Sequence, residues 1–225
     1  MNPSSNISIN SISNNNTTTT TNTTTTTTTT NNNNNNDNSV NIYHERQSKM
    51  FCALHALNNV FQDKIFSKNC LDRIADNLNT NSFINPHRNI FGLGNYDANV
   101  LVIALQQCGY DIVWCDKRKT IAGHKLNFDN IFGYILNTFS NRRIFNLTLP
   151  LAGSHWIALR KLKYNNEYVY FNLDSKLCQP VVVASTDDEF VDYIEGRLRE
   201  YPETQLLFVV SNDVLQQRSW TYNKQ

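Results

Sequence analysis

The chain has 225 residues, with 20 basic and 19 acidic side chains and a formal net charge of +1. This balance lacks the basic stripe that nucleic-acid binding needs, so we predict no nucleic-acid partner. The N-terminus shows no cationic segment followed by an apolar core, and no run of about 18 apolar residues occurs, so we predict neither a signal peptide nor a membrane span. We therefore expect a cytoplasmic protein, a nuclear protein or both.

The cysteines argue against a disulfide framework and against a structural zinc site. There are five, an odd number, and no two of them form a Cys-x-x-Cys pair. They are Cys52, Cys70, Cys108, Cys115 and Cys178. This usage fits a reducing compartment, and we expect neither a metal nor an organic cofactor.

Three regions are predicted along the chain. Residues 1–39 are almost wholly Asn, Thr and Ser, with Asp37 as the one charged residue, so this leader is predicted to be disordered. We interpret it as a tolerated repeat expansion rather than a recruiting tail. Residues 40–220 form a single domain that is large enough for a real core, and residues 221–225 are a tail.

The domain is predicted to be α+β. Helices are expected over 52–62 and after the capping residues Ser67, Asp97 and Thr186, since apolar residues then recur every three or four positions. Short apolar or alternating runs predict strands over 111–115, 131–136, 155–162, 168–174 and 205–210. The stretches 77–94, 117–130 and 137–153 are predicted as loops, and a polar tail follows Ser211.

Cys52 is the first candidate for chemistry. It falls at the first turn of the predicted helix, where free backbone N–H groups and the positive end of the helix dipole favour a thiolate. Gln47 lies five residues upstream, and its side-chain amide could donate a hydrogen bond to a developing oxyanion. A buried structural cysteine is the alternative, because free cysteine is often a small core residue.

A histidine and a carboxylate supply the rest of a cysteine-hydrolase site. His155 opens one strand of a predicted hairpin and Asp174 ends the other, so the hairpin brings them together. His155 would take the thiol proton, and Asp174 would orient the ring. His44 is close to Cys52 in sequence but is less well placed to act as its base. His55 is predicted to be a packed or partly exposed helical residue, and His124 a surface-loop residue. On spacing alone, purely structural roles for all of these residues remain open.

Three stretches resemble the Josephin family. They are His44–Gln47 with Cys52–Asn59, then Gly94–Val100, and finally His155-Trp156 with Tyr170–Leu177. The match runs in order over about residues 40–220 and is closest to the short members, in which the domain is nearly the whole protein. The Asn/Thr leader has no counterpart in the family, and no ubiquitin-interacting helices or polyglutamine tract follow the domain.

The resemblance implies a papain-like fold of the α+β class and a cysteine peptidase that removes ubiquitin. Carried over by residue, it makes Cys52 the nucleophile, His155 the general base and acid, Asp174 the orienting residue and Gln47 the oxyanion donor. Ataxin-type members have Asn at the position of Asp174. The implied partners are ubiquitin and ubiquitinated proteins, and we expect a monomer without a cofactor.

Two alternatives remain open on the sequence. A papain-like thiol hydrolase of another substrate class would turn over a small peptide or ester and leave ubiquitin conjugates alone. A ubiquitin-binding module with little or no activity would bind ubiquitin without forming a covalent adduct. The sequence does not indicate the ubiquitin linkage, the physiological substrate or the role of the leader.

Overall fold

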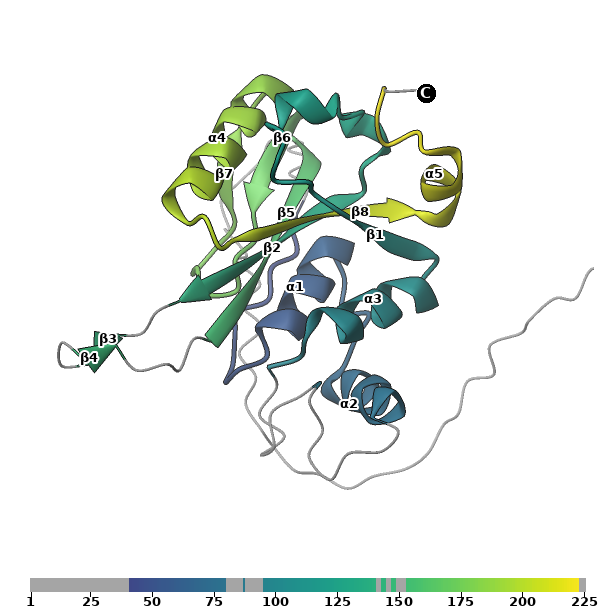
Figure 1. Ribbon diagram of the computed structural model, residues 1–225, viewed down its shortest axis with the longest axis vertical. Helices are drawn as coiled ribbons and strands as arrows, with labels where there is room; N and C mark the ends of the chain where they lie inside the picture. The colour runs from purple at the N-terminus through teal and green to yellow at the C-terminus, as the bar shows by residue number, and fades with distance from the viewer. Residues whose placement is uncertain are drawn as a thin grey trace, which may run out of the picture.

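The computed structural model of the chain describes residues 41–79, 87, 95–140, 143–144, 147–148 and 153–222. It has one antiparallel sheet in the order β1-β8-β2-β5-β6-β7, with helices on both faces (Figure 1). The helices are α1 (Cys52–Phe61), α2 (Lys68–Leu78), α3 (Ala98–Gln107), η1 (Ala122–His124), η2 (Phe128–Asn130), α4 (Asp187–Glu200) and α5 (Asn212–Gln217). The strands are β1 (Tyr110–Trp114), β2 (Gly133–Ser140), β5 (Gly153–Tyr164), β6 (Glu167–Asn172), β7 (Val181–Ala184) and β8 (Gln205–Ser211), with β3 (Arg143–Ile144) and β4 (Leu147–Thr148) as a separate pair.

The predicted α+β papain-like architecture is confirmed. The sheet separates two apolar cores, and successive residues of β5 alternate between them. Trp156 and Ala158 belong to the core under α1, α2 and α3, whereas Ile157 and Leu159 belong to the core under α4. Because helices cover both faces, the strand is an almost continuous apolar run instead of an apolar–polar alternation. In the described part of the chain, no helix has the length and apolarity to cross a bilayer.

The predicted helix starts are confirmed by their capping contacts. The side chain of Ser67 accepts a hydrogen bond from the Cys70 amide, and the Thr186 side chain accepts one from the Glu189 amide. Asp97 accepts from two amides of α3 in the same way. Each cap satisfies backbone donors that a helix cannot satisfy internally, and it thereby sets the first residue of the helix.

The predicted strands need correction, and β3 and β4 also lie in the stretch 137–153 that was predicted as a loop. β2 continues to Ser140, so residues 137–140 are not a loop; the register with β5 pairs Asn137 with Trp156 and Thr138 with His155. β7 was not predicted, because it is a four-residue edge strand with two exposed valines. β6 ends at Asn172 rather than at Asp174, which lies two residues beyond the strand.

The C-terminal segment is also different from the prediction. Ser211 caps α5, and Trp220 then packs on Phe208, so these residues are part of the domain rather than a polar tail. The Trp220 carbonyl accepts a hydrogen bond of 2.9 Å from the Asn127 amide. Thr221 of this segment donates to the His124 carbonyl, and the His124 ring lies 3.0 Å from the Asp116 carbonyl oxygen. His124 is buried at 7% exposure, so the prediction of a surface-loop histidine was wrong. The leader and most of residues 80–94 lie outside the described residues.

Candidate active site

Cys52 is the first residue of α1, and this helix start differs from the others. No side chain caps it, because its N-cap position is Phe51. The remaining α-helices of the described chain all begin with a capping Ser, Thr or Asp. The first-turn amides of α1 are therefore left for another acceptor, and the Cys52 sulfur is at that end. Cys52 is 4% exposed, and its sulfur lies 3.9 Å from the Ser154 carbonyl oxygen on β5.

His155 and Asp174 are paired in the structure. The Nε2 atom of His155 lies 2.7 Å from Asp174 Oδ1, and the two side chains are 7% and 15% exposed. A turn after β6 positions the carboxylate, since the Asn172 side chain accepts a hydrogen bond of 2.9 Å from the Asp174 amide. Asp174 Oδ1 also accepts a hydrogen bond from the Lys176 amide at 2.9 Å. The predicted proximity is present, although Asp174 reaches His155 from a turn and not from a strand end.

The pKa shifts of His155 and Asp174 depend on interactions within the candidate site, and Cys52 is one of the causes for His155. Burial lowers the pKa of His155, but hydrogen bonding to Asp174 and to Cys52 outweighs it, and the net shift is upward. Burial acts to raise the pKa of Asp174, but the bonds from His155 and the Lys176 amide lower it overall. Because Nε2 faces Asp174, Nδ1 is the ring nitrogen left for the sulfur. This arrangement favours the protonated form of the His155 ring.

Gln47 lies next to the Asp174 turn. Its backbone amide donates to the Ser175 carbonyl at 2.6 Å, and its side-chain oxygen accepts from the Ser175 hydroxyl at 3.3 Å. The side-chain nitrogen donates to the Lys49 carbonyl at 2.7 Å. The Gln47 side-chain nitrogen carries two hydrogens, so it can keep the bond to the Lys49 carbonyl and donate its second hydrogen to an oxyanion.

The residues before α1 hold a buried polar network that the sequence did not reveal. The Glu45 carboxylate accepts hydrogen bonds from His55 Nδ1 at 2.7 Å and from Asn58 at 3.1 Å, and a further one from the Tyr43 hydroxyl. These bonds outweigh the opposing effect of burial and lower the pKa of Glu45. His55 is thus a packed helical residue, as predicted. The sequence signal for this network is an acidic residue, Glu45, shortly before a helix that carries polar residues at His55 and Asn58.

Asn59 joins the three segments that carry the candidate residues. It is completely buried on α1, its Oδ1 accepts from the Glu45 amide at 2.7 Å, and its Nδ2 donates to the Leu173 carbonyl at 2.8 Å. His44 adds a second link, since its Nε2 lies 3.1 Å from the Asp174 carbonyl oxygen. Burial is the largest influence on His44 and lowers its pKa, so the neutral ring donates this bond. His44 faces the Asp174 backbone, whereas His155 faces the carboxylate.

Comparison with known proteins shows which family the chain is related to. The Josephin family model matches residues 47–197. Josephin-2 of Homo sapiens is 40% identical over 179 residues, which cover 80% of this chain and 91% of that protein. A Josephin-like protein of Drosophila melanogaster is 42% identical over 70% of this chain and 69% of its own length. Ataxin-3 of Rattus norvegicus is a more distant relative, 25% identical over 77% of this chain and 47% of its own length.

A cysteine at an uncapped helix start, combined with a histidine on the adjacent sheet and a carboxylate on the turn after β6, is the arrangement of the papain-like class of architecture. Within that class, the chain belongs to the Josephin family. Among the described residues, no group of three or more His, Cys, Asp or Glu side chains converges as the ligands of a metal would.

Proposed function

We propose that this protein is a cysteine-type deubiquitinase that hydrolyses the peptide or isopeptide bond at the C-terminus of ubiquitin. The observation that carries the proposal is His155, which hydrogen bonds to Asp174 at 2.7 Å while its pKa is raised by contacts with both Asp174 and Cys52. A purely binding domain has no need for an imidazole held between a thiol and a carboxylate. Membership of the Josephin family supports ubiquitin as the substrate.

The proposed reaction follows from the roles of these side chains. His155 takes the Cys52 proton, and the thiolate attacks the terminal carbonyl carbon of ubiquitin. The imidazolium then protonates the leaving lysine amine, which leaves a thioester between ubiquitin and Cys52. Water, deprotonated by His155, attacks the thioester and releases ubiquitin with a free carboxylate. Asp174 stabilises the imidazolium in both steps, and Gln47 together with the first-turn amides of α1 would hold the oxyanion.

The decisive experiment is reaction with ubiquitin that carries a thiol-reactive group at its C-terminus, followed by intact-protein mass spectrometry. We expect an adduct of one ubiquitin on the wild-type chain and none on Cys52→Ala, because the nucleophile is missing. Cys178→Ala is the matched control, since Cys178 is the exposed cysteine and should leave the adduct unchanged. Circular dichroism checks that both variants are folded.

The other outcomes separate the alternatives. A folded protein that binds plain ubiquitin but forms no adduct is a binding module. A protein that neither binds ubiquitin nor reacts, but cleaves a small ester through Cys52, is a thiol hydrolase of another substrate class. An adduct that persists in Cys52→Ala would reject the proposed nucleophile.

A further inference from the structure

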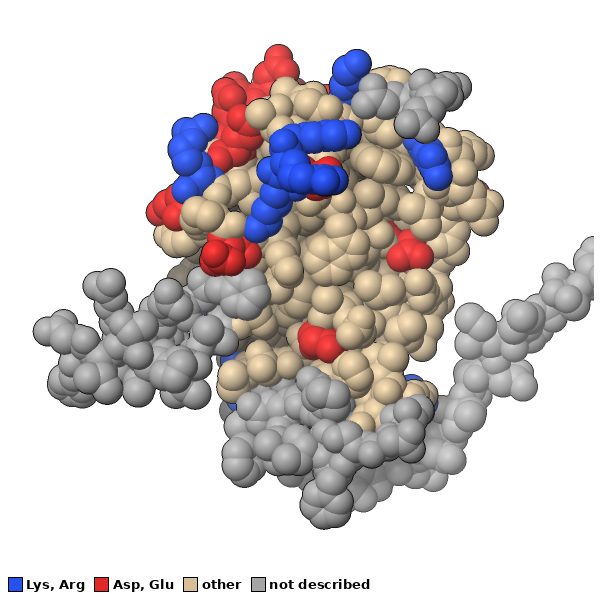
Figure 2. All heavy atoms as spheres, in the orientation of Figure 1, with Lys and Arg blue, Asp and Glu red and all other residues tan. Residues whose placement is uncertain are grey.

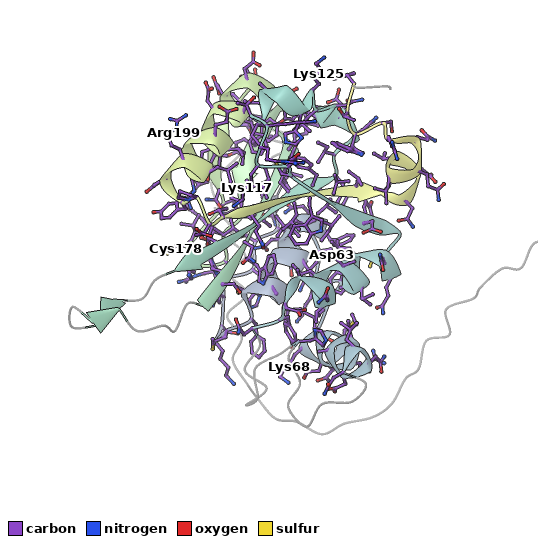
Figure 3. All side chains as sticks on the ribbon, in the orientation of Figure 1. Asp63, Lys68, Lys117, Lys125, Cys178 and Arg199 are labelled. Atoms are coloured by element: carbon purple, nitrogen blue, oxygen red, sulfur yellow. The ribbon has the colours of Figure 1, made fainter. Side chains whose placement is uncertain are left out.

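A basic groove lies between α4 and the loop that follows β1. Its volume is about 410 Å³, and it is lined by Lys117–Ile121, by Glu195, Leu198 and Arg199 of α4, and by Pro202. Figure 2 shows Lys and Arg atoms gathered on the upper part of this face, and Figure 3 labels Lys117 and Arg199. Four cations and one carboxylate line this groove, although the whole chain is nearly neutral.

The four cations are not equivalent. Arg118 is neutralised by Asp116, to which its guanidinium donates two hydrogen bonds of 2.8 Å. The Lys117 ammonium donates to the Pro202 carbonyl at 2.6 Å. Lys119 and Arg199 are exposed, and neither forms a side-chain hydrogen bond or an ion pair with any described residue. The groove therefore offers two free positive charges, one from the loop and one from the helix.

Apolar surface and a single carboxylate complete the lining. Ile121, Leu198 and Pro202 provide the apolar part. The Glu195 carboxylate accepts a hydrogen bond of 3.0 Å from the Ile121 amide. Glu195 would repel a compact phosphate group, which concentrates negative charge at one point. An extended acidic peptide can instead direct separate carboxylates at Lys119 and Arg199 and place an apolar side chain between them.

The groove is on the same edge of the sheet as the candidate active site. The register runs from Trp114 at the end of β1 through Leu207 of β8 and Ile135 of β2 to Ala158 of β5, and His155 lies three residues from Ala158 toward the same strand ends. The groove and His155 are therefore both reached from this end of the sheet, with the groove on the side that α4 covers.

We propose that this groove docks an acidic, leucine-containing segment of the ubiquitinated protein, which makes it a substrate-selecting site beside the active site. The inference rests on the proposed function only for the identity of the partner as a ubiquitinated protein. Binding of the segment itself requires neither Cys52 nor ubiquitin.

The first test is a binding titration, read by fluorescence anisotropy. The probes are a labelled decapeptide of glutamate with three interspersed leucines and a matched peptide in which glutamine replaces glutamate. The groove variant is Lys119→Glu with Arg199→Glu. The control is Lys64→Glu with Lys163→Glu, which changes the net charge equally at exposed positions outside the groove.

We expect the acidic peptide to bind the wild-type chain and the control within a factor of three, and the groove variant at least tenfold more weakly. Added salt should weaken this binding, and the glutamine peptide should not bind. Equal losses in both double variants, equal binding of the glutamine peptide or no binding at all would overturn the proposal. Tighter binding of a ten-nucleotide oligothymidylate than of the peptide would also overturn it and assign the groove to a phosphate polymer.

A second measurement connects the groove to turnover. For ubiquitin joined to the acidic peptide through a lysine side chain, the groove variant should have a KM about tenfold higher with kcat unchanged. For ubiquitin with a small fluorogenic leaving group, both constants should be unchanged. If the wild-type chain cleaves neither substrate, the proposed function fails while the titration still decides the groove; if it cleaves both and the variant is unaffected, only the groove proposal fails.

Discussion

The imidazole of His155 is hydrogen bonded through Nε2 to the Asp174 carboxylate, and the Cys52 side chain also raises its pKa. Asp174 and Cys52 both favour its protonated form, and together they overcome the effect of burial. A raised pKa means that the imidazolium persists as the pH rises and is lost when the pH passes through the raised value. The thiolate–imidazolium pair of the proposed mechanism should therefore remain populated above the ordinary titration range of histidine.

Asp174→Asn tests this cause directly. The amide can still accept a hydrogen bond from His155 but carries no charge, so the pKa of His155 should fall. We expect the basic limb of the pH profile for adduct formation to move to lower pH, and the rate at neutral pH to fall about three- to tenfold. The profile is measured with the ubiquitin probe between pH 5 and 10.

The control for this experiment is Asp188→Asn, which removes an exposed carboxylate on α4 and should leave the profile unchanged. A basic limb that stays in place in Asp174→Asn would show that the charge of Asp174 does not set the titration of His155. Asp174→Ala removes the hydrogen bond as well as the charge, and we expect it to cost about 100-fold in rate.

At the scale of elements, the site depends on how α1, the segment before it and the turn after β6 are joined. These segments carry Cys52, Gln47 and Asp174 respectively. Asn59 contacts the two flanking segments from the buried face of α1, through Glu45 and Leu173. Asn59 is therefore the buried side chain of α1 that joins the helix to both flanking segments, beside the links that His44 and Gln47 make to the turn after β6.

Asn59→Leu should both destabilise the fold and slow the reaction. The substitution conserves approximate size but leaves the Glu45 amide and the Leu173 carbonyl buried without these partners, at roughly 1–3 kcal/mol each. We expect the free energy of unfolding, measured with urea, to fall by about 2–5 kcal/mol. In the protein that remains folded, adduct formation should be at least tenfold slower.

Asn130→Leu is the matched control, because Asn130 also donates to a distant backbone carbonyl, that of Ser219 at 2.8 Å. It lies on the second core, away from Cys52, so it should lower stability without slowing adduct formation of the folded protein. If Asn59→Leu shows the same behaviour as Asn130→Leu, Asn59 has a structural role alone.

Local signals were sufficient for the features that short-range chemistry determines. The caps at Ser67, Asp97 and Thr186 predicted three helix starts, and the hairpin predicted the meeting of His155 with Asp174. Asn59 was missed because its partner Leu173 is 114 residues away, and a single sequence carries no sign of that contact. His124 was misjudged because the C-terminal segment that contacts it is distant in the chain and looks polar in sequence.

At the scale of the whole molecule, each face of the sheet packs against helices and forms a separate apolar core. The first core lies under α1, α2 and α3 and supports the candidate active site. The second lies under α4 and is closed at one side by η1, η2 and the C-terminal segment. The basic groove borders this second core through Ile121 and Leu198. The two proposed sites therefore rest on separate cores that share one sheet.

This division predicts what the C-terminal segment does. Removal of residues 212–225 eliminates α5, exposes Phe208 where Trp220 packs on it, and breaks the bond from the Asn127 amide to the Trp220 carbonyl. We expect the free energy of unfolding to fall by on the order of 3 kcal/mol, from lost apolar burial and lost hydrogen bonds. Urea denaturation gives the value.

A chain that ends at Tyr222 is the control, because it keeps these contacts, including the bond of 2.9 Å from the Tyr222 amide to the Lys125 carbonyl. Trp220→Ala is a milder variant for the case in which the long deletion does not fold, and it should cost about 1–2 kcal/mol because Trp220 is half-buried. In either variant, the folded protein should react with the ubiquitin probe at the wild-type rate, since the first core is intact. If Trp220→Ala is as stable as the control, the C-terminal segment does not support the second core. If a folded variant loses its reactivity with the ubiquitin probe, the two cores are coupled through the sheet.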